Sequence, residues 1–135
     1  MRVLIADDHP LVRRAIRTLL AQRENCEVYE ASDGAEAIRT TLEIKPDLLI
    51  LDVMMPVMNG YEAATNLRAL APGVPILFVS ANSDPGILEE AKRIGARGFV
   101  HKSKLGSALL GAVDRLVARN RTYFPDSTEN QAIAP

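Results

Sequence analysis

The residues most able to do chemistry in this chain are three carboxylates, one hydroxyl and one ammonium group. Asp7 and Asp8 follow the first of five short apolar runs, Asp52 the third, Ser80 the fourth and Lys102 the fifth. Carboxylates held close together repel one another unless a cation or a proton intervenes. A hard divalent ion would relieve that repulsion, and the lack of a histidine and cysteine ligand set favours Mg²⁺ over Zn²⁺.

The same set of groups suits the transfer of a phosphoryl group. A metal cation, the ammonium group of Lys102 and the hydroxyl of Ser80 would stabilise the charge that spreads over phosphoryl oxygens. A carboxylate can itself be the nucleophile and form an aspartyl phosphate. Asp52 is the predicted nucleophile because it is central among these positions.

Each residue also has an ordinary structural interpretation. An Asp-Asp pair after a strand is more often a helix cap than a metal site, and Asp8 could favour a helix that begins near Pro10. Taken alone, Lys102 would be a solvated surface residue and Ser80 a satisfied hydroxyl at a strand end. The functional interpretation therefore depends on all these residues lying at strand exits.

The five apolar runs predict the strands that position these groups. The runs that begin at Val3, Leu48 and Ile76 are continuous rather than alternating, as expected for strands covered on both faces. The predicted strands are Val3–Ala6, Cys26–Tyr29, Leu48–Leu51, Ile76–Val79 and Gly98–Val100.

Amphipathic helical patterns lie between and after the predicted strands. Pro10 suits a first helical position, Asn59 precedes a third helix, and Ser103 can cap a fifth helix. The apolar stripes fall within residues 11–20, 37–42, 63–70, 87–94 and 105–117. Strict alternation of strand and helix predicts an α/β fold, with parallel strands and helices on both faces of the sheet.

The predicted topology brings the polar groups together. In an open parallel sheet, ligands bind outside the carboxyl ends of the strands, at the point where the strand order reverses. If the first strand lies beside the third, as in the order 2-1-3-4-5, Asp7, Asp8 and Asp52 converge in one pocket.

Composition limits the class of protein. The chain has 135 residues, 47% of them hydrophobic, which predicts one domain over residues 1–121 and a polar linker or disordered tail over residues 122–135. A net charge of -1 gives no general attraction to nucleic acid or anionic membranes. A single cysteine, Cys26, and the lack of a signal peptide or a long apolar span predict a soluble, cytoplasmic protein.

Five segments in this order resemble the receiver domain of bacterial two-component response regulators, over residues 2 to about 120. Any one segment is a weak signal, but five at these spacings are specific. The segments are Ile5–Pro10, Pro46–Pro56, Met58–Gly60, Val79–Ala81 and Gly95–Lys102. The resemblance implies a flavodoxin-like (βα)5 fold and is strongest to the branch with a C-terminal helix-turn-helix DNA-binding domain, which is absent from these 135 residues.

The resemblance also implies a role for each site residue. Asp52 would be the phosphoacceptor, and Lys102 would form the ion pair. Mg²⁺ would be bound by Asp8, by Asp52 and by the main-chain oxygen of Met54, with Asp7 acting through water.

A second group of residues would act as the switch. Ser80 would bond to a phosphoryl oxygen, and Phe99 would occupy the aromatic position that swings inward on activation. The surface of the fourth helix, from about residue 84 to 94, with the fifth strand and fifth helix would then change.

The function implied is a phosphorylation-dependent switch. It would accept a phosphoryl group from a sensor histidine kinase and control an output domain or partner, with transcription the expected output. No enzyme activity is expected beyond self-directed phosphoryl acceptance and slow dephosphorylation. Possible dimer faces are the fourth helix, fifth strand and fifth helix, or the first and fifth helices. No membrane contact is expected, and DNA contact would need the absent domain.

Two other functions compete with this one. The first is a receiver-like interaction module that works without phosphate, and such a module would be expected to lose part of the acidic set. The second is a phosphatase or phosphotransferase acting on small molecules, whose Asp-x-Asp signature would have to follow the first strand. Asp7 and Asp8 are adjacent, which argues against that enzyme class.

Overall fold

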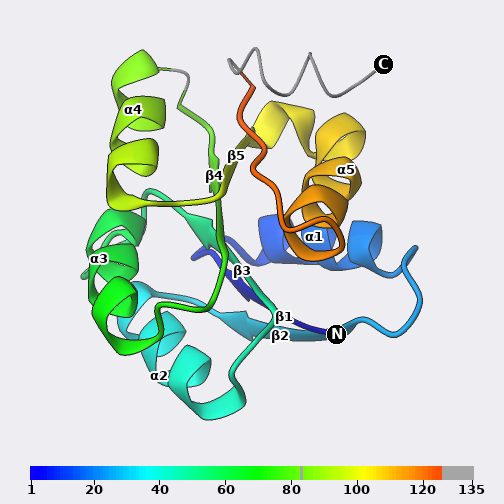
Figure 1. Cartoon of the computed structure of the whole chain (residues 1–135), viewed down its shortest axis with the longest axis horizontal. Helices are drawn as coiled ribbons and strands as arrows, with labels where there is room; N and C mark the ends of the chain where they lie inside the picture. The colour runs from blue at the N-terminus through cyan, green and yellow to red at the C-terminus, as the bar shows by residue number, and fades with distance from the viewer. Residues whose placement is uncertain (83, 126–135) are drawn as a thin grey trace.

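The computed structural model describes residues 1–82 and 84–125. Within them, five parallel strands form one sheet in the order β2-β1-β3-β4-β5, with helices on both faces (Figure 1), which confirms the predicted flavodoxin-like receiver fold. The strands are β1 (Arg2–Ala6), β2 (Glu27–Ala31), β3 (Leu48–Asp52), β4 (Ile76–Ser80) and β5 (Gly98–His101). The helices are α1 (Pro10–Leu20), α2 (Gly34–Ile44), α3 (Gly60–Leu70), α4 (Pro85–Ile94) and α5 (Leu105–Val117), with a 3-10 turn η1 (Lys102–Lys104). None of these helices is long and apolar enough to cross a bilayer.

The inner strands supply both hydrophobic cores. Successive side chains of a strand point to opposite faces of the sheet. In β3, Leu49 and Leu51 therefore lie in the core beneath α2, α3 and α4, whereas Leu48 and Ile50 lie in the core beneath α1 and α5 (Figure 1). This two-sided burial explains why the run is apolar at every position.

The carboxyl end of β3 lies directly against the start of α3. The side chain of Asn59 accepts a hydrogen bond from the backbone N–H of Glu62, and the Glu62 carboxylate accepts one from the backbone N–H of Asn59. A Cβ atom at Gly60 would overlap the carbonyl oxygen of Asp52. Glycine therefore lets the helix begin close enough to hold the end of β3 in place.

Most strands are one residue longer than predicted, and the largest differences are at β2 and at the start of α5. β2 begins at Glu27 instead of Cys26 and continues to Ala31. It is an edge strand with mostly exposed or half-buried residues, so hydrophobicity locates its ends poorly. The predicted cap at Ser103 is wrong, because Ser103 lies inside η1 and α5 begins after Lys104.

The chain returns to the sheet after α5. Tyr123 forms a parallel bridge with Gly98 of β5, and Phe124 is only 7% exposed. The described packing therefore extends past residue 121, where the sequence predicts that the tail begins. Residues 126–135 of the predicted tail lie outside the described residues.

Candidate functional site

The structure brings the predicted site residues to one edge of the sheet. Asp7 and Asp8 follow β1, Asp52 and Ser80 are the last residues of β3 and β4, and Lys102 follows β5. Since all the strands are parallel, these positions share the carboxyl edge. The ammonium nitrogen of Lys102 joins two of them, at 2.8 Å from Asp7 Oδ2 and 3.3 Å from Asp52 Oδ2.

Lys102 is held as a cation by its two carboxylate partners. Its side chain is 15% exposed. Burial alone would lower the pKa of the ammonium group. The close contact with the Asp7 carboxylate and the negative charges of Asp52 and Asp7 outweigh burial, so the pKa is raised. Lys102 therefore supplies a permanent positive charge between two carboxylates.

Asp52 is a buried carboxylate whose pKa is raised by its surroundings. It is 2% exposed, and its Oδ1 accepts a hydrogen bond of 3.3 Å from the backbone N–H of Met54. Burial, followed by the charge of Asp7, raises the pKa of Asp52 to about 6, although Lys102 and the Met54 N–H act in the opposite direction. Asp52 is therefore mostly ionised at neutral pH, but its negative charge is only partly compensated by its surroundings.

Three buried carboxylate oxygens lack well-aligned hydrogen bonds. These atoms are Asp7 Oδ2, Asp8 Oδ1 and Asp52 Oδ2, and the contacts of Lys102 to two of them are ion pairs without good hydrogen-bond geometry. One ligand atom each from Asp7, Asp8, His9 and Asp52 lies within 4.8 Å of the others. Orphaned oxygens in such a cluster fit a hard divalent cation such as Mg²⁺.

His9 is a part of this cluster that the sequence did not predict. Its Nδ1 atom lies 3.1 Å from Asp8 Oδ1 and 3.3 Å from Asp7 Oδ1, and its backbone N–H donates to Asp7 Oδ1 at 2.8 Å. The only signal was its position directly after Asp8. Arg13 adds a second unpredicted contact, because its guanidinium donates to the main-chain oxygen of Asp7 at 2.6 Å.

The two predicted switch residues lie on the neighbouring strands β4 and β5. Ser80 is 1% exposed, its hydroxyl oxygen accepts a hydrogen bond of 3.1 Å from Asn82 N–H, and it pairs with His101 in the sheet register. Phe99 is also 1% exposed, and its ring lies edge-on to His101 with centroids 5.2 Å apart. His101, which neighbours both Ser80 and Phe99, directly precedes Lys102 in the sequence.

Residues 3–114 match the family model described as the response regulator receiver domain. The chain belongs to this family. The receiver of a two-component system that the sequence predicts is therefore confirmed. The family covers the whole βα framework up to the middle of α5.

Individual relatives agree with this assignment. The chain is 36% identical to the glycerol metabolism activator of Pseudomonas putida, over 96% of its own length and 60% of that protein. A two-component response regulator of the LuxR family from Aurantimonas superimposes with a TM-score of 0.87 and 31% identity, covering 98% of this chain and 95% of the other. The isolated REC domain of RcsB from Salmonella enterica serovar Typhimurium, solved with the phosphomimetic BeF3⁻, gives 0.86 and 28%, covering 96% of each chain.

The relatives are longer proteins with different activities. The chain spans 60% of the Pseudomonas activator but 34% of a protein-glutamate methylesterase/protein-glutamine glutaminase from Caldanaerobacter subterraneus, to which it is 38% identical. Receivers similar to this one thus occur in proteins named as a metabolic activator and as an enzyme. Similarity of the receiver does not name the output.

Proposed function

We propose that this receiver is a phosphorylation-operated switch whose phosphoacceptor is Asp52. The observation that supports this most is the placing of a buried carboxylate, Asp52, 3.3 Å from the ammonium group of Lys102 and beside the acidic pair. A sensor histidine kinase would be the phosphoryl donor. In the transfer, an oxygen of Asp52 would form a bond to phosphorus while the bond from phosphorus to the donor nitrogen breaks.

The surrounding residues would hold the cation and the charge. Asp8, Asp52 and the main-chain oxygen of Met54 would bind Mg²⁺ directly, with Asp7 acting through water. The bound cation would offset the negative charge of the carboxylates and of the phosphoryl oxygens. Lys102 would keep its ammonium group beside the acceptor, which favours a phosphoryl group there through charge-assisted contacts.

The output would be a changed surface at α4, β5 and α5. Ser80 and Phe99 lie on adjacent strands between Asp52 and this surface. A phosphoryl group that engages Ser80 can shift Phe99 only by binding the two arrangements with different affinity. That surface, or the face of α1 and α5, would then bind a second copy or an output partner such as a transcription domain.

Intact-protein mass spectrometry tests the phosphoacceptor. The chain is incubated with acetyl phosphate and Mg²⁺, and one added phosphoryl group is expected. Asp52→Asn should abolish the addition. Asp47→Asn is the control and should leave the addition unchanged, because Asp47 lies at the amino end of β3, away from the site, where its carboxylate accepts from Arg2 N–H at 2.8 Å. An unmodified wild-type chain would favour the phosphate-independent interaction module.

The order of metal affinities tests the assignment within the acidic pair. Both oxygens of Asp7 have close protein partners, His9 N–H and Lys102. Asp8 is 28% exposed, and its buried Oδ1 accepts no hydrogen bond from the described residues, although His9 Nδ1 lies 3.1 Å away. Asp8→Ala should therefore weaken Mg²⁺ binding, measured by calorimetric titration, more than Asp7→Ala does. The reverse order would mean that the two roles are exchanged.

A further inference from the structure

The outer edge of β5 is covered by the chain's own C-terminal strap, defined here as residues 120–125. β5 is the last strand of the sheet, and a strand edge with unpaired N–H and C=O groups readily takes a further strand. Tyr123 supplies it. Its N–H donates to the carbonyl of Arg97 at 2.9 Å, and its carbonyl accepts from the N–H of Phe99 at 2.9 Å.

The strap approaches β5 closely at a glycine. A Cβ atom at Gly98 would lie 3.0 Å from the carbonyl oxygen of Tyr123, besides meeting Leu77 at 2.8 Å. One residue further, Phe124 packs in the same core cluster as Phe99, and the ammonium group of Lys92 lies 5.3 Å from its ring centroid. Backbone pairing and a buried ring therefore both hold the strap on β5.

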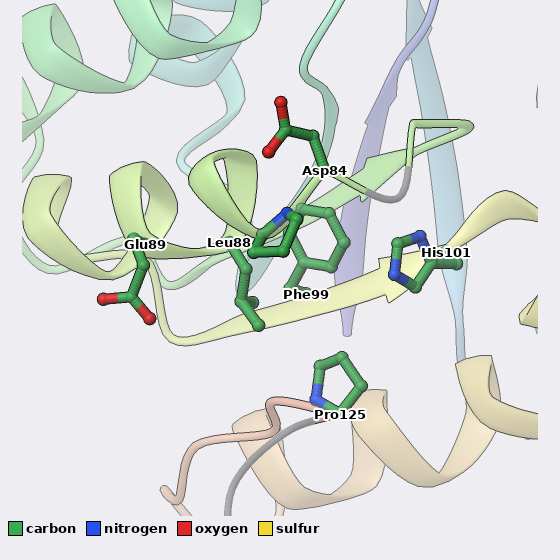
Figure 2. A pocket seen from close by; sticks show the side chains of 7 residues that line it. Asp84, Leu88, Glu89, Phe99, His101 and Pro125 are labelled. Atoms are coloured by element: carbon green, nitrogen blue, oxygen red, sulfur yellow. The ribbon is translucent and has the colours of Figure 1, made fainter.

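Pro125 places the strap beside the predicted switch residue. A hollow of about 280 Å³ lies between α4, β5 and the strap, lined by Pro125, by Phe99 and His101 of β5, and by Leu88 of α4. In the view of Figure 2, Pro125 lies across the β5 ribbon from the rings of Phe99 and His101, and Leu88 lies beside Phe99. A change in the position of the Phe99 ring would alter the shape of this hollow, which Pro125 also lines, and the packing of the core cluster that contains Phe124.

The strap begins at a bend and contacts α5 as well as β5. Asn120 has a left-handed backbone with φ of 52°, where the chain turns back from α5. Arg115 accepts from Arg121 N–H at 2.8 Å and donates its side-chain N–H to the Thr122 carbonyl at 3.2 Å. The conformational entropy of ordering the strap opposes these hydrogen bonds and the burial of Phe124, so the free energy of docking is a difference between opposing terms.

We propose that the strap docks reversibly on the outer edge of β5, and that its docking is coupled to the position of the Phe99 ring. A change in the position of Phe99 would then alter how tightly the strap is held on β5. That Phe99 moves on phosphorylation rests on the proposed function. The coupling itself rests on the shared hydrogen bond between Phe99 N–H and Tyr123 and on the shared core packing.

Amide hydrogen exchange of the full chain, measured by NMR, tests the docking. Phe124→Ala should speed exchange at the Phe99 and Tyr123 amides by about tenfold or more, while the β3 amides stay protected. Tyr29→Ala, which removes an aromatic ring packed on the same core from the opposite edge strand, should leave both amides protected. Unchanged exchange in Phe124→Ala would overturn the proposal.

Two further variants guard against a trivial loss of folding. Tyr123→Pro removes the N–H that bonds to Arg97, together with the tyrosine ring, but keeps Phe124, and it should also speed exchange at Phe99. Phe99→Leu keeps the core nearly filled and leaves the backbone bonds possible, so faster exchange at Tyr123 would report coupling through the ring. A Tyr123 amide as protected in Phe99→Leu as in the wild type would overturn the coupling.

Beryllofluoride with Mg²⁺ connects the strap to the proposed function. In the wild-type chain, binding at Asp52 should change the exchange of the Phe99 and Tyr123 amides together, by about threefold or more. If signals of Asp8 and Asp52 shift and these amides do not respond, the strap does not report the switch. If Asp52 shows no binding, the proposed function fails, while the variants above still decide whether the strap docks and senses Phe99.

Discussion

Replacing Asp52 by asparagine should stabilise the metal-free protein at neutral pH. Burial and the nearby charge of Asp7 raise the pKa of Asp52 from 3.8 to about 6. A pKa that is higher in the folded state means that protonated Asp52 favours folding. The contribution of this group to stability is fully present below about pH 3.8 and is lost as the pH rises through about 6.

The size of the effect follows from the two pKa values. Their separation of roughly two pH units corresponds to about 3 kcal/mol between the ionised and neutral forms. Asparagine is neutral and nearly isosteric, although it weakens the partner contact of Lys102. Asp52→Asn should therefore raise the free energy of unfolding by about 1 to 3 kcal/mol at pH 7, with the gain vanishing near pH 4.

Urea denaturation in EDTA, followed by circular dichroism from pH 4 to pH 7, measures this difference. Asp114→Asn is the matched control, because Asp114 is 43% exposed and pairs at 3.4 Å with Arg119, so its removal should change stability by about 0.5 kcal/mol or less. Excess Mg²⁺ should stabilise the wild type more than Asp52→Asn and so narrow the gap. An Asp52→Asn protein no more stable than wild type at pH 7 in EDTA would refute the electrostatic reasoning.

Two further substitutions probe the framework around the site. Gly60→Ala should lower the free energy of unfolding by more than about 2 kcal/mol in thermal or urea denaturation, because its Cβ would overlap the Asp52 carbonyl oxygen; a neutral effect would show that α3 shifts easily. Tyr61→Phe should cost about 1 kcal/mol, since it removes the O–H that donates to the Ile87 carbonyl at 2.7 Å. Burial raises the pKa of Tyr61 to about 12, so one tyrosine should ionise late in an ultraviolet titration, and its ionisation near pH 10 would contradict that burial.

Much of the fold could be predicted because its strands are buried on both faces. Leu48–Leu51 is apolar at every position, so a strand buried on both faces, followed directly by Asp52 at its carboxyl end, can be predicted from the pattern. β2 could be located only roughly, since an edge strand such as Glu27–Ala31 buries little. Turn and cap residues fixed the start of α3 at Asn59, but η1 left Ser103 without the predicted capping role.

The C-terminal strap was missed for a related reason. Tyr123 and Phe124 are two aromatic residues inside a polar stretch, and a pair of residues has no periodicity that would predict a strand. Their place beside β5 depends on a contact between residues far apart in the sequence, the close approach of the Tyr123 carbonyl to Gly98. In this chain, hydrophobic periodicity therefore could not predict that Tyr123 pairs with the edge strand β5 at Gly98.

The geometry of the acidic site sharpens what the sequence could say about its charge. Convergence of Asp7, Asp8 and Asp52 follows from the strand order, but the sequence does not say which carboxylate Lys102 contacts. The nearer one is Asp7, at 2.8 Å, against 3.3 Å for Asp52. Burial is the main cause of the raised pKa of Asp52, and the charge of Asp7 adds to it, because one ammonium group shared between two carboxylates leaves negative charge that a proton on Asp52 relieves. A divalent cation would take over that task, so cation binding and ionisation of Asp52, the proposed phosphoacceptor, would be linked. The same negative charge that destabilises the metal-free fold would then leave Asp52 ionised once the cation binds.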